Sequence, residues 1–254
     1  MSTKVLLVGE SWTTSETHYK GFDQFGSVRF QTGATPLLDA LKDSEFQIEY
    51  MTAHDAAEGF PFEISGLDGY DIIILSDIGA NTFLLPPDVW LRSKCVPNRL
   101  RMLKEWVEAG GNLIMMGGYF SFQGIDGKAR WRKTAVEDTL PVTCLPWDDR
   151  IEIPEGAVAE ITAPEHPVMA GLTDMVWPPI LGVNEVELRE GAQVLAKLPD
   201  DQGGHPLLVL GNHGKGRTAA WTSDIAPHWL SPEFCEWEGY ALLWKNVLGW
   251  LAAR

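Results

Sequence analysis

Short apolar runs closed by glycine or polar residues recur along the first half of the chain, each of the length of one strand. They cover residues 4–9, 46–51, 70–75 and 112–116. Continuous apolar runs of this length are typical of strands buried on both faces of a parallel sheet. Residues 13–32 are polar and aromatic without a clear period, and we expect a long loop there.

Helical signals lie between these strands. Thr35 supplies a hydroxyl cap and Pro36 a first helical position. A short helical turn is expected at 54–58. Residues 97–109 carry apolar side chains at helical spacing and end at Gly110, as helices often do. Strands that alternate with helices predict a parallel sheet with helices on both faces and right-handed crossovers.

After residue 120 the pattern changes to short alternating stretches, which we interpret as an antiparallel extension of the sheet. They lie at 151–153, 157–161, 183–188, 193–198, 206–210 and 217–222. Glycines within 211–216 predict a hairpin turn, and 233–253 has the pattern of a long amphipathic helix. We expect a flavodoxin-like three-layer α/β/α sandwich with a mostly parallel central sheet. No linker divides it, so we expect one domain over residues 1–254.

Charge and composition narrow the class of protein. The chain has 254 residues, with 20 Lys and Arg against 35 Asp and Glu, and a net charge of -15. Such a surface repels phosphate backbones, which argues against a nucleic-acid partner. No apolar stretch approaches the roughly 20 residues that span a bilayer, and no secretory leader is evident. Three scattered cysteines without a CxxC pair suit a reducing cytoplasm.

Candidate chemistry gathers where the predicted strands end, because ligands of parallel α/β sheets bind beyond the carboxyl ends of the strands. The side chains placed there are Glu10, Ser11, Trp12, Asp77, Asn81, Tyr119, Ser121, Asp224 and His228. Carboxylates, a histidine and a tyrosine in one cleft suit acid–base catalysis, or binding of a metal or polyol. The alternative for each residue is a capping or loop-anchoring role. We expect no metal and no cofactor.

Other candidates have simpler explanations. His205 and His213 flank a predicted strand but belong to no metal-binding motif. Residues 211–216 contain glycines and a lysine, as a phosphate loop does, but at the wrong spacing and between two strands. Eleven tryptophans, most of them late in the chain, line a pocket in some proteins and more often form a core or a subunit interface.

Five segments in this order resemble the class I glutamine-amidotransferase-like superfamily. They are residues 4–12, 70–77, 110–118, 166–172 and 214–224. Within it, the chain is most similar to the bacterial branch described as putative glutamine amidotransferases, which is related to ThuA-like proteins. Active members of the superfamily place a cysteine in a strained strand-to-helix elbow. The resemblance puts Tyr119 at that position, beside Gly118, and His228 at the histidine position, with Glu233 as its partner.

A neutral phenol is a poor nucleophile near pH 7, so the resemblance implies no glutaminase activity. Two hypotheses follow. One is a small-molecule-binding or structural protein that has lost the nucleophile. The other is a hydrolase or isomerase that acts on a sugar-like or amide substrate through Glu10, Asp77, Asp224 and His228. We also expect a homo-oligomer, built on the C-terminal helix or on the extension after residue 120.

Overall fold

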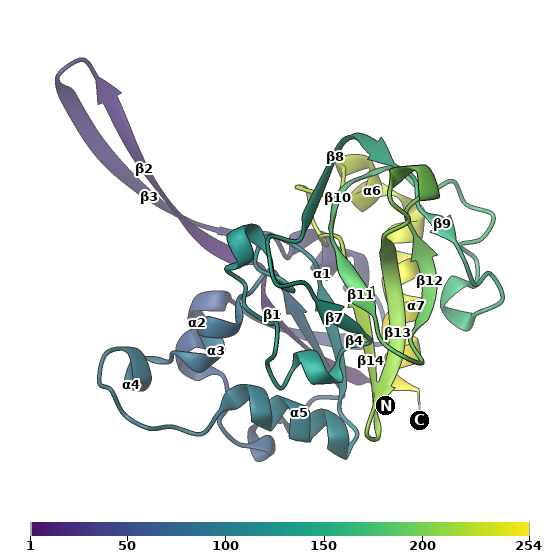
Figure 1. Ribbon diagram of the computed structural model, residues 1–254, viewed down its shortest axis with the longest axis horizontal. Coiled ribbons are helices and arrows are strands. Elements are labelled where there is room, and N and C mark those ends of the chain that lie inside the picture. The colour runs from purple at the N-terminus through teal and green to yellow at the C-terminus, as the bar shows by residue number, and fades with distance from the viewer. Residues whose placement is uncertain (1, 254) are drawn as a thin grey trace.

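An eight-stranded sheet forms the centre of the protein in the computed structural model, which describes residues 2–253. The parallel strands are, in spatial order, β4 (Phe46–Met51), β1 (Thr3–Gly9), β5 (Ile72–Ser76), β6 (Asn112–Met116) and β14 (Gly216–Trp221). The sheet continues with antiparallel β13 (Pro206–His213), β12 (Gln193–Lys197) and β9 (Glu160–Ile161). The predicted flavodoxin-like α/β class and its antiparallel extension are therefore confirmed (Figure 1).

Helices cover both faces of this sheet. One core holds α1 (Thr35–Leu41) and α7 (Glu238–Ala252), and the other holds α2 (Ala53–Gly59), α3 (Ala80–Leu84) and α5 (Arg99–Ala109). Neighbouring strand residues go to opposite cores, Leu7 to the first and Leu6 to the second. Because side chains alternate across a strand, a continuous apolar run supplies both cores at once.

The remaining elements are short. Two small antiparallel sheets pair β8 (Arg150–Ala157) with β10 (Ile180–Asn184) and β7 (Val142–Cys144) with β11 (Val186–Leu188). A four-residue helix, α4, covers Pro87–Trp90. Five 3₁₀ helices are η1 (Ile64–Leu67), η2 (Ile125–Gly127), η3 (Glu137–Thr139), η4 (Pro167–Met169) and η5 (Asp200–Gln202). Within residues 2–253, no helix is both long and apolar enough to cross a membrane.

The predicted C-terminal helix is two helices, α6 (Pro232–Glu236) and α7. Trp237 separates them with an extended backbone, and its indole folds against Gly239, where a Cβ would lie 2.1 Å from the ring. The apolar side of α7 packs inward, and Tyr240 and Trp244 are buried in the first core with Trp221. The core interpretation of these tryptophans is confirmed, and α7 therefore presents little free apolar surface for a subunit contact.

The expected loop at 13–32 is wrong, because those residues form a long antiparallel hairpin, called the arm below (residues 11–32). Strand β2 (Ser11–Lys20) pairs with β3 (Asp23–Thr32) over ten residue pairs. Gly21, with φ of 66°, begins a two-residue turn of the kind that joins hairpin strands. The Thr, Tyr, Phe and Val content favours strands. The arm projects from the rest of the molecule (Figure 1).

Candidate functional site

The sheet order places the ends of β1, β5, β6 and β14 side by side, and with them three carboxyl groups. Glu10, Asp77 and Asp224, called the acid cluster below, follow β1, β5 and β14. Gly118, which follows β6, lies between two of them. A Cβ at this glycine would come within 2.7 Å of Asp77 Oδ1 and 2.8 Å of Asp224 Oδ1. The site therefore depends on glycine at 118, which also has φ of +131°.

Glu10 is buried, with 5% of its surface exposed. Its backbone is left-handed, with φ of 48°, a conformation that is strained for a residue other than glycine. Ser76 Oγ donates to Glu10 Oε2 at 2.6 Å, and Glu10 N–H donates to Ser76 O at 2.8 Å. Burial, and then the charges of Asp77 and Asp224, raise the pKa of Glu10 well above its ordinary value. The environment therefore favours the protonated acid.

Asp77 spans the gap between β5 and the segment after β6. Its backbone is also left-handed, with φ of 41°. Its Oδ1 accepts a hydrogen bond of 2.6 Å from Phe120 N–H, and its own N–H donates to Ser121 Oγ at 3.1 Å. Burial and the charge of Asp224 raise the pKa of Asp77 to about 6, while the Phe120 amide and His228 oppose the shift. Asp77 thus exchanges protons near neutral pH.

Asp224 and His228 form a hydrogen-bonded pair. His228 Nδ1 donates to Asp224 Oδ2 at 2.7 Å, and Trp229 N–H donates to the same oxygen at 3.0 Å. The carboxylate is buried, whereas the imidazole is 43% exposed. The bond to Asp224 is the main cause that raises the pKa of His228. Glu233, which the resemblance suggested as the partner, is exposed in the first turn of α6, so that assignment is wrong.

The Nε2 side of the imidazole is free. Within residues 2–253, His228 Nε2 has no hydrogen-bond partner, and a proton held on Nδ1 by the Asp224 carboxylate leaves Nε2 of the neutral ring as an acceptor. The ring of Tyr119 packs edge-on against the imidazole, with 4.4 Å between ring centroids. Tyr119 OH donates to Glu152 Oε1 at 3.3 Å, and the Arg150 guanidinium lies 4.9 Å from the phenol ring. The Tyr119 side chain therefore packs against one side of the His228 ring, and Glu152 and Arg150 contact it there.

The segment after β6 does not build a nucleophile elbow. Residues 118–123 form turns and bends, and the next helical element is η2 at Ile125. Tyr119 is not among the residues with positive φ. In such elbows the amide after the nucleophile helps to form the oxyanion hole, and here that amide is occupied, since Phe120 N–H donates to Asp77 Oδ1. The amide before it, Gly118 N–H, donates to Asn184 Oδ1. The Phe120 amide is therefore directed at Asp77 and not at a substrate position.

Two buried residues that the sequence did not reveal hold Gly118 in place. Asn184 accepts from Gly118 N–H at 3.0 Å and donates to Gly118 O at 3.2 Å and to Asp149 Oδ1 at 2.8 Å. Asp149 also accepts from the amides of Gln123 and Gly124. Burial raises the pKa of Asp149 to about 6. No motif or spacing could have linked them, because Asn184 lies 66 positions from Gly118.

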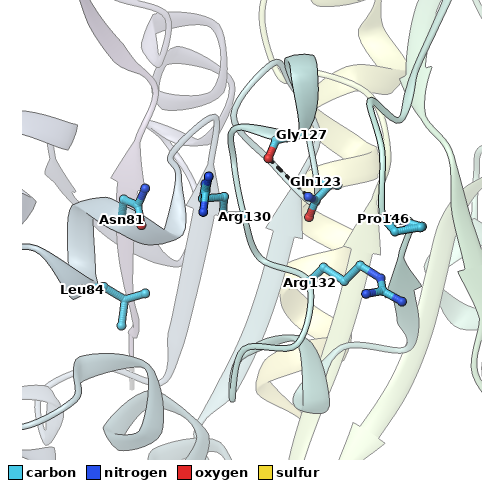
Figure 2. A pocket seen from close by; sticks show the side chains of 7 residues that line it. All are labelled: Asn81, Leu84, Gln123, Gly127, Arg130, Arg132 and Pro146. Atoms are coloured by element: carbon cyan, nitrogen blue, oxygen red, sulfur yellow. Dashed lines mark hydrogen bonds between the residues drawn. The ribbon is translucent and has the colours of Figure 1, made fainter.

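Three predicted site residues have other contacts or surroundings than the acid cluster. Ser11 Oγ accepts from Ala53 N–H at 2.8 Å and so anchors α2, and Trp12 is 42% exposed in β2 of the arm. Asn81 belongs to α3. It lines a separate pocket of about 400 Å³ together with Gln123, Arg130 and Arg132 (Figure 2). For Ser11, the anchoring alternative therefore holds.

Metal ligation and thiol chemistry have no support in the described residues. Within residues 2–253, no group of three or more His, Cys, Asp and Glu side chains is arranged to hold a metal. Residues 211–216 hold the end of β13, the turn at 214–215 and the start of β14, and His213 pairs with Glu108 at 3.2 Å. Burial raises the pKa of Cys144, and that of Cys235 to about 11, so neither is a ready thiolate.

Comparisons with known proteins agree with this architecture. The family model described as "Putative glutamine amidotransferase" matches residues 4–253. Two structures described as cytoplasmic proteins of Salmonella typhimurium, STM3548 and STM1381, are 43% and 42% identical, with TM-scores of 0.93 and 0.92. Each alignment covers 98% of this chain and 99% of the other.

A more distant structure shares the fold alone. It is a ThuA-like protein from Bacteroides uniformis, which is 13% identical with a TM-score of 0.61 over 98% of this chain and 91% of that one. A search of curated proteins gave no match. The family match over nearly all of the sequence confirms the resemblance seen in the five segments. The chain belongs to the family of putative glutamine amidotransferases.

Proposed function

We propose that this protein has no glutaminase activity and is an acid–base enzyme, a hydrolase or isomerase, that acts on a small sugar-like or amide molecule at the acid cluster. The observation that carries the proposal is the Asp224–His228 pair, with 2.7 Å between Oδ2 and Nδ1. A buried carboxylate that fixes the tautomer and raises the pKa of a half-exposed histidine is the arrangement used to activate a general base.

The neighbouring acids supply the second half of acid–base chemistry. Glu10 and Asp77 both have a raised pKa, and Asp77 titrates at about 6. A site with a histidine base and a carboxylic acid of raised pKa can remove a proton at one atom and return it at another. Polyhydroxy or amide molecules present the donors and acceptors that such side chains bind. A cytoplasmic location, as described for the two Salmonella proteins, is part of this proposal.

A binding protein without turnover is the second candidate, and Tyr119 favours it. The phenol stands where active relatives have their nucleophile, and contacts with His228, Arg150 and Glu152 hold it in place. In that case the same residues bind a ligand, but the protein does not convert it.

The experiment compares wild type with His228→Asn and with a matched control, His213→Asn. His213 also pairs with a carboxylate, Glu108, but lies in the β13–β14 hairpin, away from the acid cluster. Each protein is screened by thermal shift against amides, amino acids, sugars and polyols, and conversion of any ligand is followed by NMR. We expect one ligand class to stabilise wild type and the control, but not His228→Asn.

Conversion by wild type that is lost in His228→Asn supports an enzyme, and binding without conversion supports the binding protein. If no class stabilises wild type, or if His228→Asn binds as well as the control, the acid cluster is not a ligand site. Ammonia release from glutamine by wild type would contradict the proposed loss of glutaminase activity.

A further inference from the structure

The arm, residues 11–32, is a two-stranded sheet that leaves the body of the protein. Its register runs from the pair Ser11 and Thr32 to the pair Lys20 and Asp23 at the tip. Figure 1 shows it extending away from the central sheet. A two-stranded hairpin is at best marginally stable by itself in water, and stability normally requires a hydrophobic face covered by other strands or helices. Beyond its base, the arm therefore lacks, among residues 2–253, the cover that such a hairpin normally needs.

The two faces of the arm differ in chemistry. Directly paired residues share a face, and faces alternate along each strand. The first face carries Thr13, Ser15, Thr17, Tyr19, Gln24, Gly26, Val28 and Phe30, none of them charged. The second face carries all the charged side chains of the arm, which are Glu16, Lys20, Asp23 and Arg29. We call the first the uncharged face.

More of the exposed apolar area lies on the uncharged face than on the charged one. On the uncharged face, Tyr19 is 73% exposed, Val28 70% and Phe30 52%. On the charged face, Trp12 is 42% exposed, and Phe25 is 51% exposed with the His18 ring stacked on it at 4.6 Å between centroids. At the arm's base, the uncharged face meets α2, since Phe30 contacts the ring of His54 edge-on. The rest of that face is exposed to solvent, whereas an antiparallel sheet normally packs one face on a core.

We propose that the uncharged face of the arm docks on the same face of the arm of a second copy of this chain. The two acidic and two basic side chains of the arm cancel, so the net charge of -15 resides entirely on the rest of the chain. A basic partner is drawn to the acidic body instead of the arm, and the bodies of two copies repel each other, so two copies meet most easily through their neutral arms. A neutral, apolar surface binds best to another neutral, apolar surface, and the uncharged face of a second arm is such a surface.

The side-chain sizes on this face are self-complementary. Tyr19 stands near the tip, Val28 and Phe30 stand toward the base, and Thr17 and Gly26 leave a low region between them. When two arms stack with opposite directions, Val28 of each copy lies over Gly26 of the other, and Tyr19 lies near Phe30. Such a two-fold, isologous contact closes on itself and makes a dimer.

The size of the arm defines how much of the contact it supplies. Ten residues at about 3.3 Å each give a face roughly 33 Å long. Specific interfaces bury about 800 Å² on each partner, more than two such narrow faces supply. Phe22 at the tip is fully exposed, and we expect it to extend the contact onto the partner's body.

The test introduces the same charge on opposite faces. Val28→Glu places a carboxylate on the uncharged face, and Thr14→Glu places one on the charged face, directly across from Arg29. Association of wild type and both variants is measured by analytical ultracentrifugation from low micromolar to about 100 μM, with unfolding monitored by circular dichroism. We expect wild type to be a dimer, Val28→Glu to weaken it at least tenfold, and Thr14→Glu to leave it unchanged.

Three results overturn the proposal. They are a monomeric wild type over the whole concentration range, a dimer that Val28→Glu does not weaken, and equal weakening by both variants. A further variant separates weaker docking from a misfolded arm. Val28→Ser removes apolar area at this exposed position without adding charge. We expect it to weaken the dimer less than Val28→Glu does, while the thermal unfolding of the protein stays as in wild type.

Discussion

Asp77 Oδ1 accepts a hydrogen bond of 2.6 Å from Phe120 N–H, the amide that directly follows Tyr119. In an amidotransferase-type elbow, the amide after the nucleophile points at the developing oxyanion. Here a carboxylate of the chain itself occupies that donor. Beside the tyrosine that the resemblance puts at the nucleophile position, Asp77 thus places a carboxylate where the reaction intermediate requires a positive environment.

The first prediction concerns the nucleophile position. Tyr119→Cys supplies the missing thiol, but the Phe120 amide remains bound to Asp77 and no helix N-terminus follows. We therefore expect no glutamine hydrolysis by this variant, measured as ammonia release at neutral pH. Release above the wild-type rate would show that a thiol at position 119 is sufficient for glutamine hydrolysis, and would contradict this prediction.

The second prediction concerns the His228 imidazole. Asp224→Asn removes the charge that raises the pKa of His228, so this pKa falls, and an NMR titration of the histidine ring protons records it. Because the folded-state pKa is raised, the pair stabilises the fold below the unfolded value near 6.5, and this stability is lost as pH rises through the folded pKa. The variant should therefore lose more Tm at pH 6 than at pH 9. Glu108→Gln, which affects His213, is the control and should leave the His228 resonance unchanged.

The third prediction concerns the buried acid Glu10. Its folded-state pKa is raised, so its contribution to stability falls as pH rises above the unfolded value near 4.3. Glu10→Gln keeps an oxygen to accept from Ser76 and removes the repulsion from Asp77 and Asp224. We expect the variant to have a higher Tm than wild type at pH 8 and a smaller difference at pH 5. Calorimetric scans at both pH values measure this, and an unchanged difference would contradict the assignment.

The fourth prediction concerns the glycine inside the acid cluster. Gly118→Ala places a methyl group within 3 Å of Asp77 and Asp224, at a φ of +131°. We expect a loss of roughly 2 kcal/mol or more in the free energy of unfolding, measured by urea titration. Gly249→Ala, in α7 with no atom within 4 Å of the added methyl, should instead gain up to about 1 kcal/mol. Similar values for the two variants would argue against the close approach at Gly118.

The fold class and most of the strands were predictable because they rest on local patterns. Apolar runs such as the one around Leu6 and Leu7 can satisfy two cores only from inside a parallel sheet. The rule that ligands bind beyond the carboxyl ends of such strands then located Glu10, Asp77, Tyr119, Asp224 and His228 without knowledge of the strand order. Their positions at one edge of the sheet follow from chain direction, whereas the sheet order decides that the strands before them are neighbours.

Only the tertiary structure decided how these residues contact one another. The choice of Asp224 over Glu233 as the partner of His228 depends on how the segment after β14 turns, and the hold of Asn184 on Gly118 joins residues 66 positions apart. The arm shows the same limit, since neither strand between 11 and 32 has a buried face to impose a period on its sequence. Its strands are defined by pairing with each other. Periodicity records burial, and contacts that form without burial, or between distant segments, leave no such record in the sequence.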